Sequence, residues 1–185
     1  MAQDDTRPML YIVATGAPLT RRIHEAVPMA DDAGWRVAVI ATEAAVSWLD
    51  HDQIGTLDVP VLTNHRQPDT AKRLPRPTAV VLAPATFNTI NKFATGAADT
   101  YPLTVLCEAL GAKRPLIIVP FVNASLAGHP AWLASLAVLR YAGATLIDPR
   151  GGALNVHEPL ASGTGESVTD AFKWSWVFDH LNMPT

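Results

Sequence analysis

The chain has 185 residues, of which 49% are apolar and 17% are charged, and its formal net charge is −3. This length and composition predict a folded domain with an ordinary core rather than a disordered chain. The charge offers no basic surface for nucleic acid or an anionic membrane, and no apolar run is long enough to predict a transmembrane helix. The single cysteine, Cys107, excludes an internal disulfide and is typical of a reducing compartment. We therefore expect a cytoplasmic protein that binds a small molecule or another protein.

Apolar runs and amphipathic patterns alternate along the chain, and we expect a flexible tail at residues 1–8 followed by a single domain at residues 9–185. Continuous apolar runs predict buried strands at residues 9–14, 35–41, 60–62, 79–83, 115–119 and 144–147. Helical patterns and capping signals predict helices at residues 19–30, 43–49, 90–94, 100–111, 130–143 and 166–181. This alternation predicts an α/β fold: a single doubly wound parallel sheet, Rossmann-like or flavodoxin-like, with helices on both faces.

Three features interrupt the alternation. Pro28 is expected to bend or shorten the first helix, because proline cannot donate a backbone hydrogen bond. Residues 63–77 are polar and rich in proline, which predicts a surface loop. Residues 149–165 form a long glycine-rich loop, which we interpret as a lid over a substrate because long loops are often functional.

In a doubly wound sheet, the loops that follow the strands meet at the carboxyl edge, where ligands bind. Such loops are expected at residues 15–20, 42–43, 84–89 and 120–126. The first loop has one glycine, Gly16, where a dinucleotide fingerprint needs three, which weakens an NAD or FAD interpretation. Its backbone N–H groups could hold a single phosphate with help from Thr20 and Thr42, and an ordinary strand–helix turn is the alternative.

The segment after the strand at 79–83 carries a motif that spans 16 positions of the sequence, PATFNTINKFATGAAD. It resembles the PASANT segment of the homo-oligomeric flavin-containing cysteine decarboxylases, which reads roughly P-A-S-A-N-T-x-x-K-x-A-x-G-x-A-D. The matching positions are Pro84, Ala85, Asn88, Thr89, Lys92, Ala94, Gly96, Ala98 and Asp99, and Thr86 replaces the serine with another hydroxyl. The resemblance extends from Leu10 to about Ile147.

A second motif of that family, P-x-M-N-x-x-M-W, is matched in part. Pro120 and Asn123 are present, while Val122, Leu126 and Ala127 replace the methionines and the tryptophan. The pantothenoylcysteine enzymes of the family also carry a cysteine in a glycine-rich loop near the C-terminus. Residues 149–165 contain no cysteine, so a coenzyme A pathway enzyme of the usual kind is not expected.

The resemblance implies FMN as the cofactor. The residues that it implies for FMN binding are Gly16, Ala17, Thr20, Thr42, Pro84, Ala85, Thr86, Asn88, Ala98 and Asp99. It implies oxidative decarboxylation of a cysteine-type thiol, in the first place a peptide C-terminal cysteine: flavin takes a hydride, carbon dioxide leaves and an enethiol forms. Asn88 would be catalytic, and Asn123 and Leu126 would contact the substrate. The family also implies a homo-oligomer, a trimer or a multiple of trimers.

The catalytic base of the family is a histidine upstream of the PASANT motif, but Thr70 stands at the corresponding spacing. His65, slightly earlier in the proline-rich loop, is the candidate base, and a solvated loop residue is the alternative. His157 is a second candidate for substrate contact. No pair of histidines has metal-ligand spacing, so we expect no metal site.

Two other functions remain open at this stage. The first is a catalytically altered, FMN-binding regulatory or interaction protein of the same fold, because the family histidine is missing and the second motif is degraded. The other is a prenyl-flavin transferase of related architecture, although that family lacks the asparagine of PATFNT.

Overall fold

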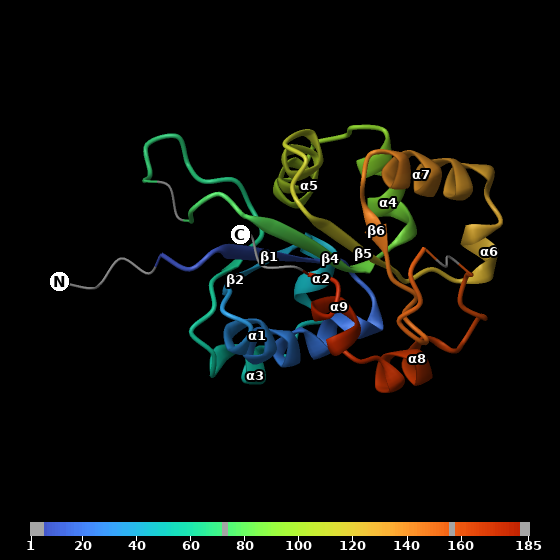
Figure 1. The fold of residues 1–185 in the computed structure, drawn as a ribbon, viewed down its shortest axis with the longest axis horizontal. Coiled ribbons are helices and arrows are strands. Elements are labelled where there is room, and N and C mark those ends of the chain that lie inside the picture. Colours follow the sequence, from blue (N-terminus) through green and yellow to red (C-terminus); the bar gives the residue numbers. More distant parts are fainter. Residues whose placement is uncertain (1–5, 72–73, 156–157, 182–185) are drawn as a thin grey trace.

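The computed structural model describes residues 6–71, 74–155 and 158–181 (Figure 1). In this part of the chain, six strands form one sheet in the order β3-β2-β1-β4-β5-β6. The strands are β1 (Met9–Ala14), β2 (Arg36–Ala41), β3 (Val61–Leu62), β4 (Ala79–Ala85), β5 (Leu116–Pro120) and β6 (Thr145–Leu146). All neighbouring strands are parallel, and the order reverses direction between β1 and β4. This confirms the predicted doubly wound sheet and places its switch point between β1 and β4.

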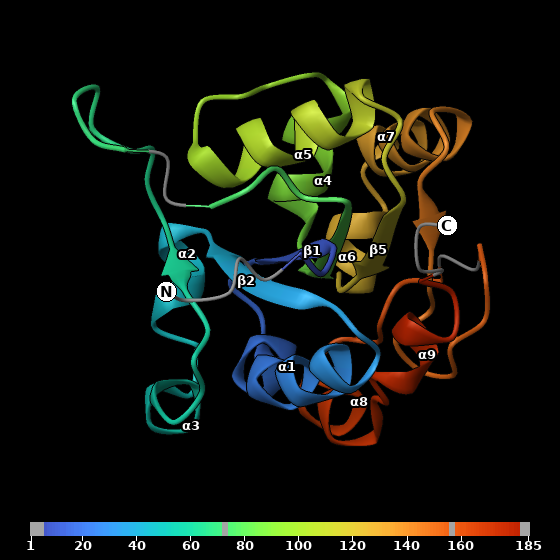
Figure 2. The same cartoon turned by 60° about the vertical axis from the view of Figure 1, so that its left-hand side comes forward.

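Helices cover both faces of the sheet, as predicted (Figures 1 and 2). One face carries α4 (Phe87–Ala94), α5 (Tyr101–Gly111) and α7 (Pro130–Tyr141). The other carries η1 (Pro18–Arg22), α1 (Ile23–Asp32), α2 (Glu43–Val46), α3 (His51–Gly55), α8 (Gly165–Ala171) and α9 (Ser175–Phe178). A short helix after β5, α6 (Ala124–Ala127), lies near the carboxyl edge.

The two central strands are buried along their whole length, which explains their unbroken apolar sequences. Successive residues of β1 point to opposite faces: Leu10 and Ile12 join the core under α1, whereas Tyr11 and Val13 join the core under α5. The sheet therefore separates two apolar cores, and its carboxyl edge is left to the loops.

Several predicted boundaries are wrong, each for a local reason. Pro28 does not shorten the first helix, because α1 continues through it to Asp32. The strand expected to end before Pro84 continues to Ala85, because the Ala85 carbonyl accepts a hydrogen bond from the Phe121 N–H at 2.9 Å. The polar loop expected there shrinks to Thr86, and residues 87–89 form the first turn of α4.

The closing helix predicted at 166–181 is divided into α8 and α9. Phe172 takes an extended conformation after α8, and its ring packs edge-on against Trp174 at 5.2 Å between centroids. Both side chains are buried, so turning them into the core requires the chain to leave the helix here. Trp174 therefore contributes to the packing of the core.

The described residues of the 63–77 loop and of residues 149–164 contain no helix or extended strand, and α8 begins at Gly165. Residues 63–71 project from the body of the molecule (Figures 1 and 2). In the glycine-rich loop, Leu154 and Leu160 each make one isolated bridge. Most of the predicted tail, residues 1–5, lies outside the described residues. Among the helices that the structure describes, none has the length and apolar character needed to cross a bilayer.

Candidate functional site

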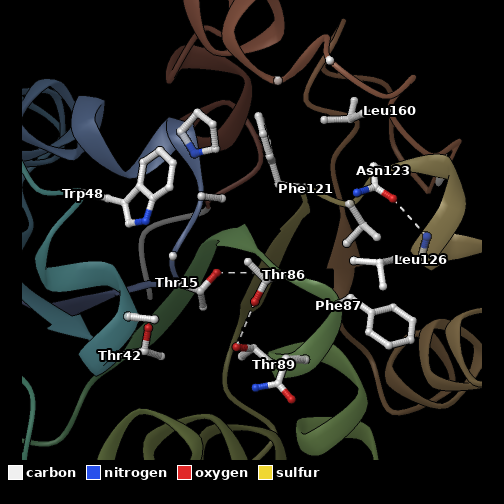
Figure 3. Close-up of a pocket in the computed structure, with 18 of the residues that line it drawn as sticks. Thr15, Thr42, Trp48, Thr86, Phe87, Thr89, Phe121, Asn123, Leu126 and Leu160 are labelled. Atoms are coloured by element: carbon white, nitrogen blue, oxygen red, sulfur yellow. Dashed lines mark hydrogen bonds between the residues drawn. The ribbon is translucent and has the colours of Figure 1, made fainter.

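A pocket of about 690 Å³ opens at the carboxyl edge of the sheet (Figure 3). The four loops expected to converge there all contribute to it, and the glycine-rich loop supplies a fifth wall. Its lining residues are Thr15, Gly16, Ala17, Pro18, Thr42, Ala44, Trp48, Thr86, Phe87, Asn88, Thr89, Phe121, Val122, Asn123, Leu126, Leu160, Ala161, Gly163 and Gly165.

The centre of the pocket is held together by Thr15. Its hydroxyl donates to the carbonyl oxygen of Pro84 at 2.7 Å and accepts from the backbone N–H of Thr86 at 3.1 Å. One side chain therefore joins the turn after β1 to the start of α4, across the switch point of the sheet. The Thr20 hydroxyl donates to the Thr15 carbonyl at 2.5 Å and is fully buried, so Thr20 supports this turn and does not line the pocket.

One end of the pocket is formed by Gly16 and Thr42. A Cβ atom on Gly16 would lie 2.9 Å from the carbonyl oxygen of Ala44, so only glycine allows the turn to approach α2 this closely. The hydroxyl oxygen of Thr42 is buried and has no hydrogen-bond partner among the described residues. A buried hydroxyl without a partner is costly, and a polar group bound beside Thr42 would remove that cost.

The floor of the pocket is the N-terminal turn of α4. Thr86 occupies the capping position, but its hydroxyl makes no capping bond and instead lies 3.3 Å from the hydroxyl of Thr89. The first N–H groups of a helix have no partner within the helix, and they carry its partial positive charge. Asn88 lies in this turn with an exposed side chain and lines the pocket. This turn can therefore receive an electron-rich group.

The other end is formed by the loop after β5. The Asn123 side-chain oxygen accepts from the backbone N–H of Leu126 at 3.0 Å and caps α6, which leaves the Nδ2 group available to donate. Phe121 and Leu160 provide buried apolar surface beside it. Leu126 is 48% exposed at the mouth. This end therefore combines one amide donor with apolar walls.

The pocket is electrically neutral apart from helix dipoles. None of its lining residues carries an ionisable side chain. A negatively charged ligand would be held by hydroxyls, amides and backbone N–H groups, and the described lining residues offer no ionisable side chain as a proton acceptor.

Three predicted site residues, His65, Ala98 and Asp99, lie away from the pocket. The His65 ring packs edge-on against Tyr101, with 5.3 Å between centroids, in a separate hollow of about 840 Å³ between the 63–77 loop and α5. Asp99 forms an exposed ion pair with Lys92 at 2.7 Å, and that hydrogen bond lowers the pKa of its carboxyl group. Ala98 is likewise not a lining residue. A single chain thus does not bring these residues to the pocket.

The remaining predictions divide by position. Gly16, Ala17, Thr42, Thr86, Asn88, Asn123 and Leu126 all line the pocket, whereas Pro84 and Ala85 are buried in β4 behind it. His157 lies outside the described residues. Among described residues, no cluster of three histidine, cysteine, aspartate or glutamate side chains is placed to hold a metal ion.

Sequence reasoning missed several lining residues, among them Pro18, Trp48, Phe121 and Leu160. Trp48 lies just beyond α2 and is 40% exposed, and a large aromatic residue near the carboxyl edge was the available signal. Leu160 is positioned by its bridge to Asn123, and no local sequence pattern predicts such a long-range contact.

The sheet order and the pocket at its carboxyl edge define a doubly wound α/β ligand-binding domain. Comparison with known families identifies it further: the sequence model of the flavoprotein family matches residues 2–170. The chain therefore belongs to the flavoprotein family, which confirms the flavoprotein resemblance.

Curated relatives match only a segment of the chain. A cysteine/cysteine sulfinic acid decarboxylase from an unknown prokaryotic organism is 39% identical over 74 residues, 40% of this chain and 20% of the relative. The coenzyme A biosynthesis bifunctional protein CoaBC of Bacillus subtilis is 39% identical over 75 residues, 40% of this chain and 18% of the relative. The matched segments thus span about a fifth of these relatives.

Solved structures share the fold over most of the chain. A PPC decarboxylase mutant has a TM-score of 0.68 at 22% identity and covers 93% of this chain and 96% of its own. The FMN-dependent cysteine decarboxylase TvaF has a TM-score of 0.62 at 24% identity, covering 77% and 90%. The peptidyl-cysteine decarboxylase EpiD has a TM-score of 0.60 at 20% identity, covering 78% and 82%. This likeness confirms the fold.

Proposed function

We propose that the pocket binds FMN. The residues fit this group: Gly16 opens a close approach to the backbone, the buried Thr42 hydroxyl lacks a partner, and the first turn of α4 presents N–H groups. Gly16, Ala17 and Thr42 would hold the phosphate, and Thr86 and Asn88 would face the ring system. The family and the FMN-dependent cysteine decarboxylases TvaF and SpaF support the same cofactor.

We further propose that the protein is a decarboxylase of a cysteine-type thiol. The observation that carries this proposal is that Asn88 and Asn123, the asparagines of the two motifs, line one pocket from the ends of neighbouring strands β4 and β5. The cysteine decarboxylases among the relatives and structural neighbours support it.

The chain's own residues have separable tasks in this reaction. Bound flavin supplies two-electron oxidation of the thiol-bearing carbon. Asn123 donates from Nδ2 to the substrate carboxylate, and its Oδ1 bond to the Leu126 N–H fixes the direction of that donor. Asn88 orients the thiol-bearing carbon with a neutral amide. Phe121 and Leu160 exclude water beside the carboxylate, which favours its loss as uncharged carbon dioxide.

The substrate that we favour is a peptide ending in cysteine. Trp48 and Leu126 are 40% and 48% exposed at the pocket, so apolar surface continues outward from it. A longer chain could use this surface, whereas free cysteine could not. Free cysteine and pantothenoyl-cysteine are the competing thiol substrates, suggested by the cysteine decarboxylase relative and by the pantothenoylaminoethenethiol complex of a PPC decarboxylase.

We propose a homo-oligomer, a trimer or a multiple of trimers, as the working form. The outer face of α7 supports it, because Leu133, Val138 and Tyr141 are 57%, 48% and 96% exposed on successive turns. We retain His65 as the proposed base on the condition that a second copy brings it to the pocket.

The test is incubation of the FMN-loaded protein with a peptide ending in cysteine, followed by mass spectrometry. We expect loss of carbon dioxide and two hydrogens from the wild type. Asn88→Ala and Asn123→Ala should abolish the product, whereas Gln53→Ala, at an exposed position in α3, should not. A loaded wild type that converts neither this peptide nor free cysteine nor pantothenoyl-cysteine contradicts the decarboxylase proposal.

A second function is a flavin-binding regulatory or interaction protein without this chemistry. The neutral lining of the pocket favours it, because no described residue of the lining is an ionisable base. It would be supported if Asn88→Ala leaves the biological effect intact while FMN still binds.

A further inference from the structure

The wall of the pocket formed by residues 160–165, called here the pocket wall, is not part of the sheet. Leu160 attaches it at one end: its N–H donates to the Val122 carbonyl and its carbonyl accepts from the Ala124 N–H, both at 2.8 Å. At the other end the wall runs directly into α8. The contacts that fix α8 therefore also fix the positions of Gly163 and Gly165 at the pocket.

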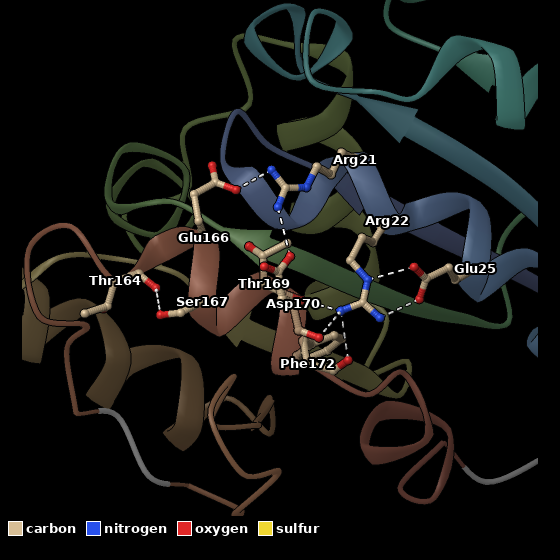
Figure 4. A network of polar contacts seen from close by, with 9 residues as sticks. All are labelled: Arg21, Arg22, Glu25, Thr164, Glu166, Ser167, Thr169, Asp170 and Phe172. Carbon is tan, nitrogen blue, oxygen red and sulfur yellow. Dashed lines mark hydrogen bonds and ion pairs between the residues drawn. The ribbon is translucent and has the colours of Figure 1, made fainter.

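Arg22, the last residue of η1, binds the C-terminal end of α8 (Figure 4). Its Nη1 donates to the carbonyl oxygens of Thr169, Asp170 and Phe172, the last two at 3.2 and 3.1 Å. Carbonyls in the last turn of a helix lack partners within the helix and carry its partial negative charge. The guanidinium thus caps α8 from a residue almost 150 positions earlier in the chain.

The Arg22 guanidinium is itself held in place. Its Nε and Nη2 donate to the two carboxylate oxygens of Glu25, both at 2.7 Å, and this pairing raises the pKa of Arg22. The Nε1–H of Trp174 donates to the Arg22 carbonyl at 3.0 Å. The side chains of Arg22 and Glu25 are 21% and 38% exposed, so this charge-assisted pair is partly shielded from water.

Arg21 offers a matched comparison. It pairs with the carboxylates of Glu166 and Asp170 on the same helix. These three side chains are 40%, 59% and 72% exposed, and exposed ion pairs contribute little to stability. Arg21 and Arg22 are therefore neighbours in η1 that both bind α8, with the same charge but different degrees of burial.

A shift of α8 would reach the pocket directly. A Cβ on Gly165, the first residue of α8, would lie 3.6 Å from Pro18 Cγ and 3.7 Å from Phe121 Cε1, and both of those residues line the pocket. α8 is also packed against η1, the segment that carries Arg22. The contact between η1 and α8 is thus continuous from the guanidinium to the pocket.

We propose that Arg22 is a positioning residue of the pocket, which holds α8 by its last carbonyls and thereby keeps the pocket wall in place. Arg22 does not contact the ligand, but by holding the wall it slows dissociation of the ligand. The choice of FMN as the probe rests on the proposed function, but the position of the wall can be measured in the protein without cofactor.

The experiment compares Arg22→Met, which keeps the apolar stem and removes the donors, with Arg21→Met. In the full chain without cofactor, hydrogen exchange at residues 160–171 should accelerate about tenfold or more in Arg22→Met, since charge-assisted hydrogen bonds are lost. Exchange in β1 and β4 should not change. FMN should dissociate from Arg22→Met about tenfold faster as well, and Arg21→Met should stay within about twofold of the wild type on both measures.

The proposal would be overturned if a folded Arg22→Met protein exchanged hydrogen at residues 160–171 at the same rate as the wild type. It would also be overturned if Arg22→Met and Arg21→Met had equal effects. If Arg22→Met does not fold, Glu25→Gln replaces it, because this change loosens the guanidinium without removing it. Local acceleration at residues 160–171 would then support the proposal, and its absence would overturn it. Failure of the wild type to bind FMN would reject the cofactor proposal and leave the exchange result standing.

Discussion

At the scale of single residues, the buried hydroxyl of Thr42 allows an effect on ligand affinity to be distinguished from an effect on folding stability. It has no partner among the described residues, whereas the hydroxyls of Thr15 and Thr20 in the same region are bonded to backbone groups. A hydroxyl without a partner contributes nothing to the folded state by hydrogen bonding and adds a desolvation cost. Under the FMN proposal, the bound cofactor supplies its partner.

Thr42→Val should therefore leave the unfolding midpoint unchanged or slightly higher, while FMN affinity falls about tenfold through the loss of one hydrogen bond to a charged phosphate. Thr56→Val, at an exposed position after α3, is the control and should not affect affinity. Fluorescence titration and thermal unfolding measure the two quantities. An unchanged FMN affinity in Thr42→Val would remove this hydroxyl from the site.

Tyr11 shows the opposite case, a buried hydroxyl that the fold uses. Its Oη donates to the Pro75 carbonyl at 2.7 Å, which attaches the proline-rich loop to β1. Burial raises the pKa of Tyr11 above its ordinary value, and Tyr101 and Glu108 raise it further. Above the ordinary pKa, the folded state holds a proton that the unfolded state has released, so stability falls as pH rises.

Tyr11→Phe should lower the free energy of unfolding by about 1 kcal/mol at neutral pH, because the bond to Pro75 is lost. The difference should shrink towards about pH 11, where ionisation in the unfolded state already disfavours the wild type. Urea unfolding at both pH values provides the comparison. A difference that grows with pH would show that Tyr11 is not held in its neutral form.

At the scale of elements, the strands were predictable because burial on both faces leaves continuous apolar runs, as in β1 and β4. The end of β4 was not predictable from local rules, because the pairing of Ala85 with Pro120 resumes beyond a proline that normally ends a strand. α6 was missed for a related reason: it is a single turn capped by Asn123, which the second motif had assigned to the substrate.

The turn between β1 and η1 depends on Gly16. Gly16→Ala would place a Cβ 2.9 Å from the Ala44 carbonyl oxygen, so the turn and α2 must separate. We expect a loss of about 1–3 kcal/mol in unfolding free energy together with weaker FMN binding. The control is Gly111→Ala at the end of α5, where a Cβ meets nothing within 4 Å and the helix should be slightly stabilised. Equal stability of the two variants would contradict the close approach at Gly16.

At the scale of the whole molecule, the topology followed from the sequence, whereas the composition of the site followed only in part. Four of the five pocket walls come directly after strands, and the alternation of strands and helices fixes that edge. The fifth wall depends on contacts such as the one between Arg22 and α8, which join distant segments of the chain. His65 illustrates the limit of motif spacing, since in one chain it lies beside Tyr101 rather than at the pocket.

The exposed face of α7 leads to a prediction about assembly. Tyr141→Glu combined with Leu133→Glu should reduce the oligomer to a smaller species in light scattering, because charges would replace apolar contact surface. Lys113→Glu, on the turn after α5, adds negative charge without changing that face and should leave the mass unchanged. A wild type that is monomeric at all concentrations would contradict the assembly proposal.

The central claim is that the pocket at the carboxyl edge is a flavin site, and direct titration of the purified protein with FMN tests it. We predict saturable quenching of flavin fluorescence with one FMN bound per chain. The affinity should be reduced in Thr42→Val and in Gly16→Ala but retained in Thr56→Val and Gly111→Ala. Absence of saturable binding to the folded wild type, or equal affinity in all four variants, would contradict the account.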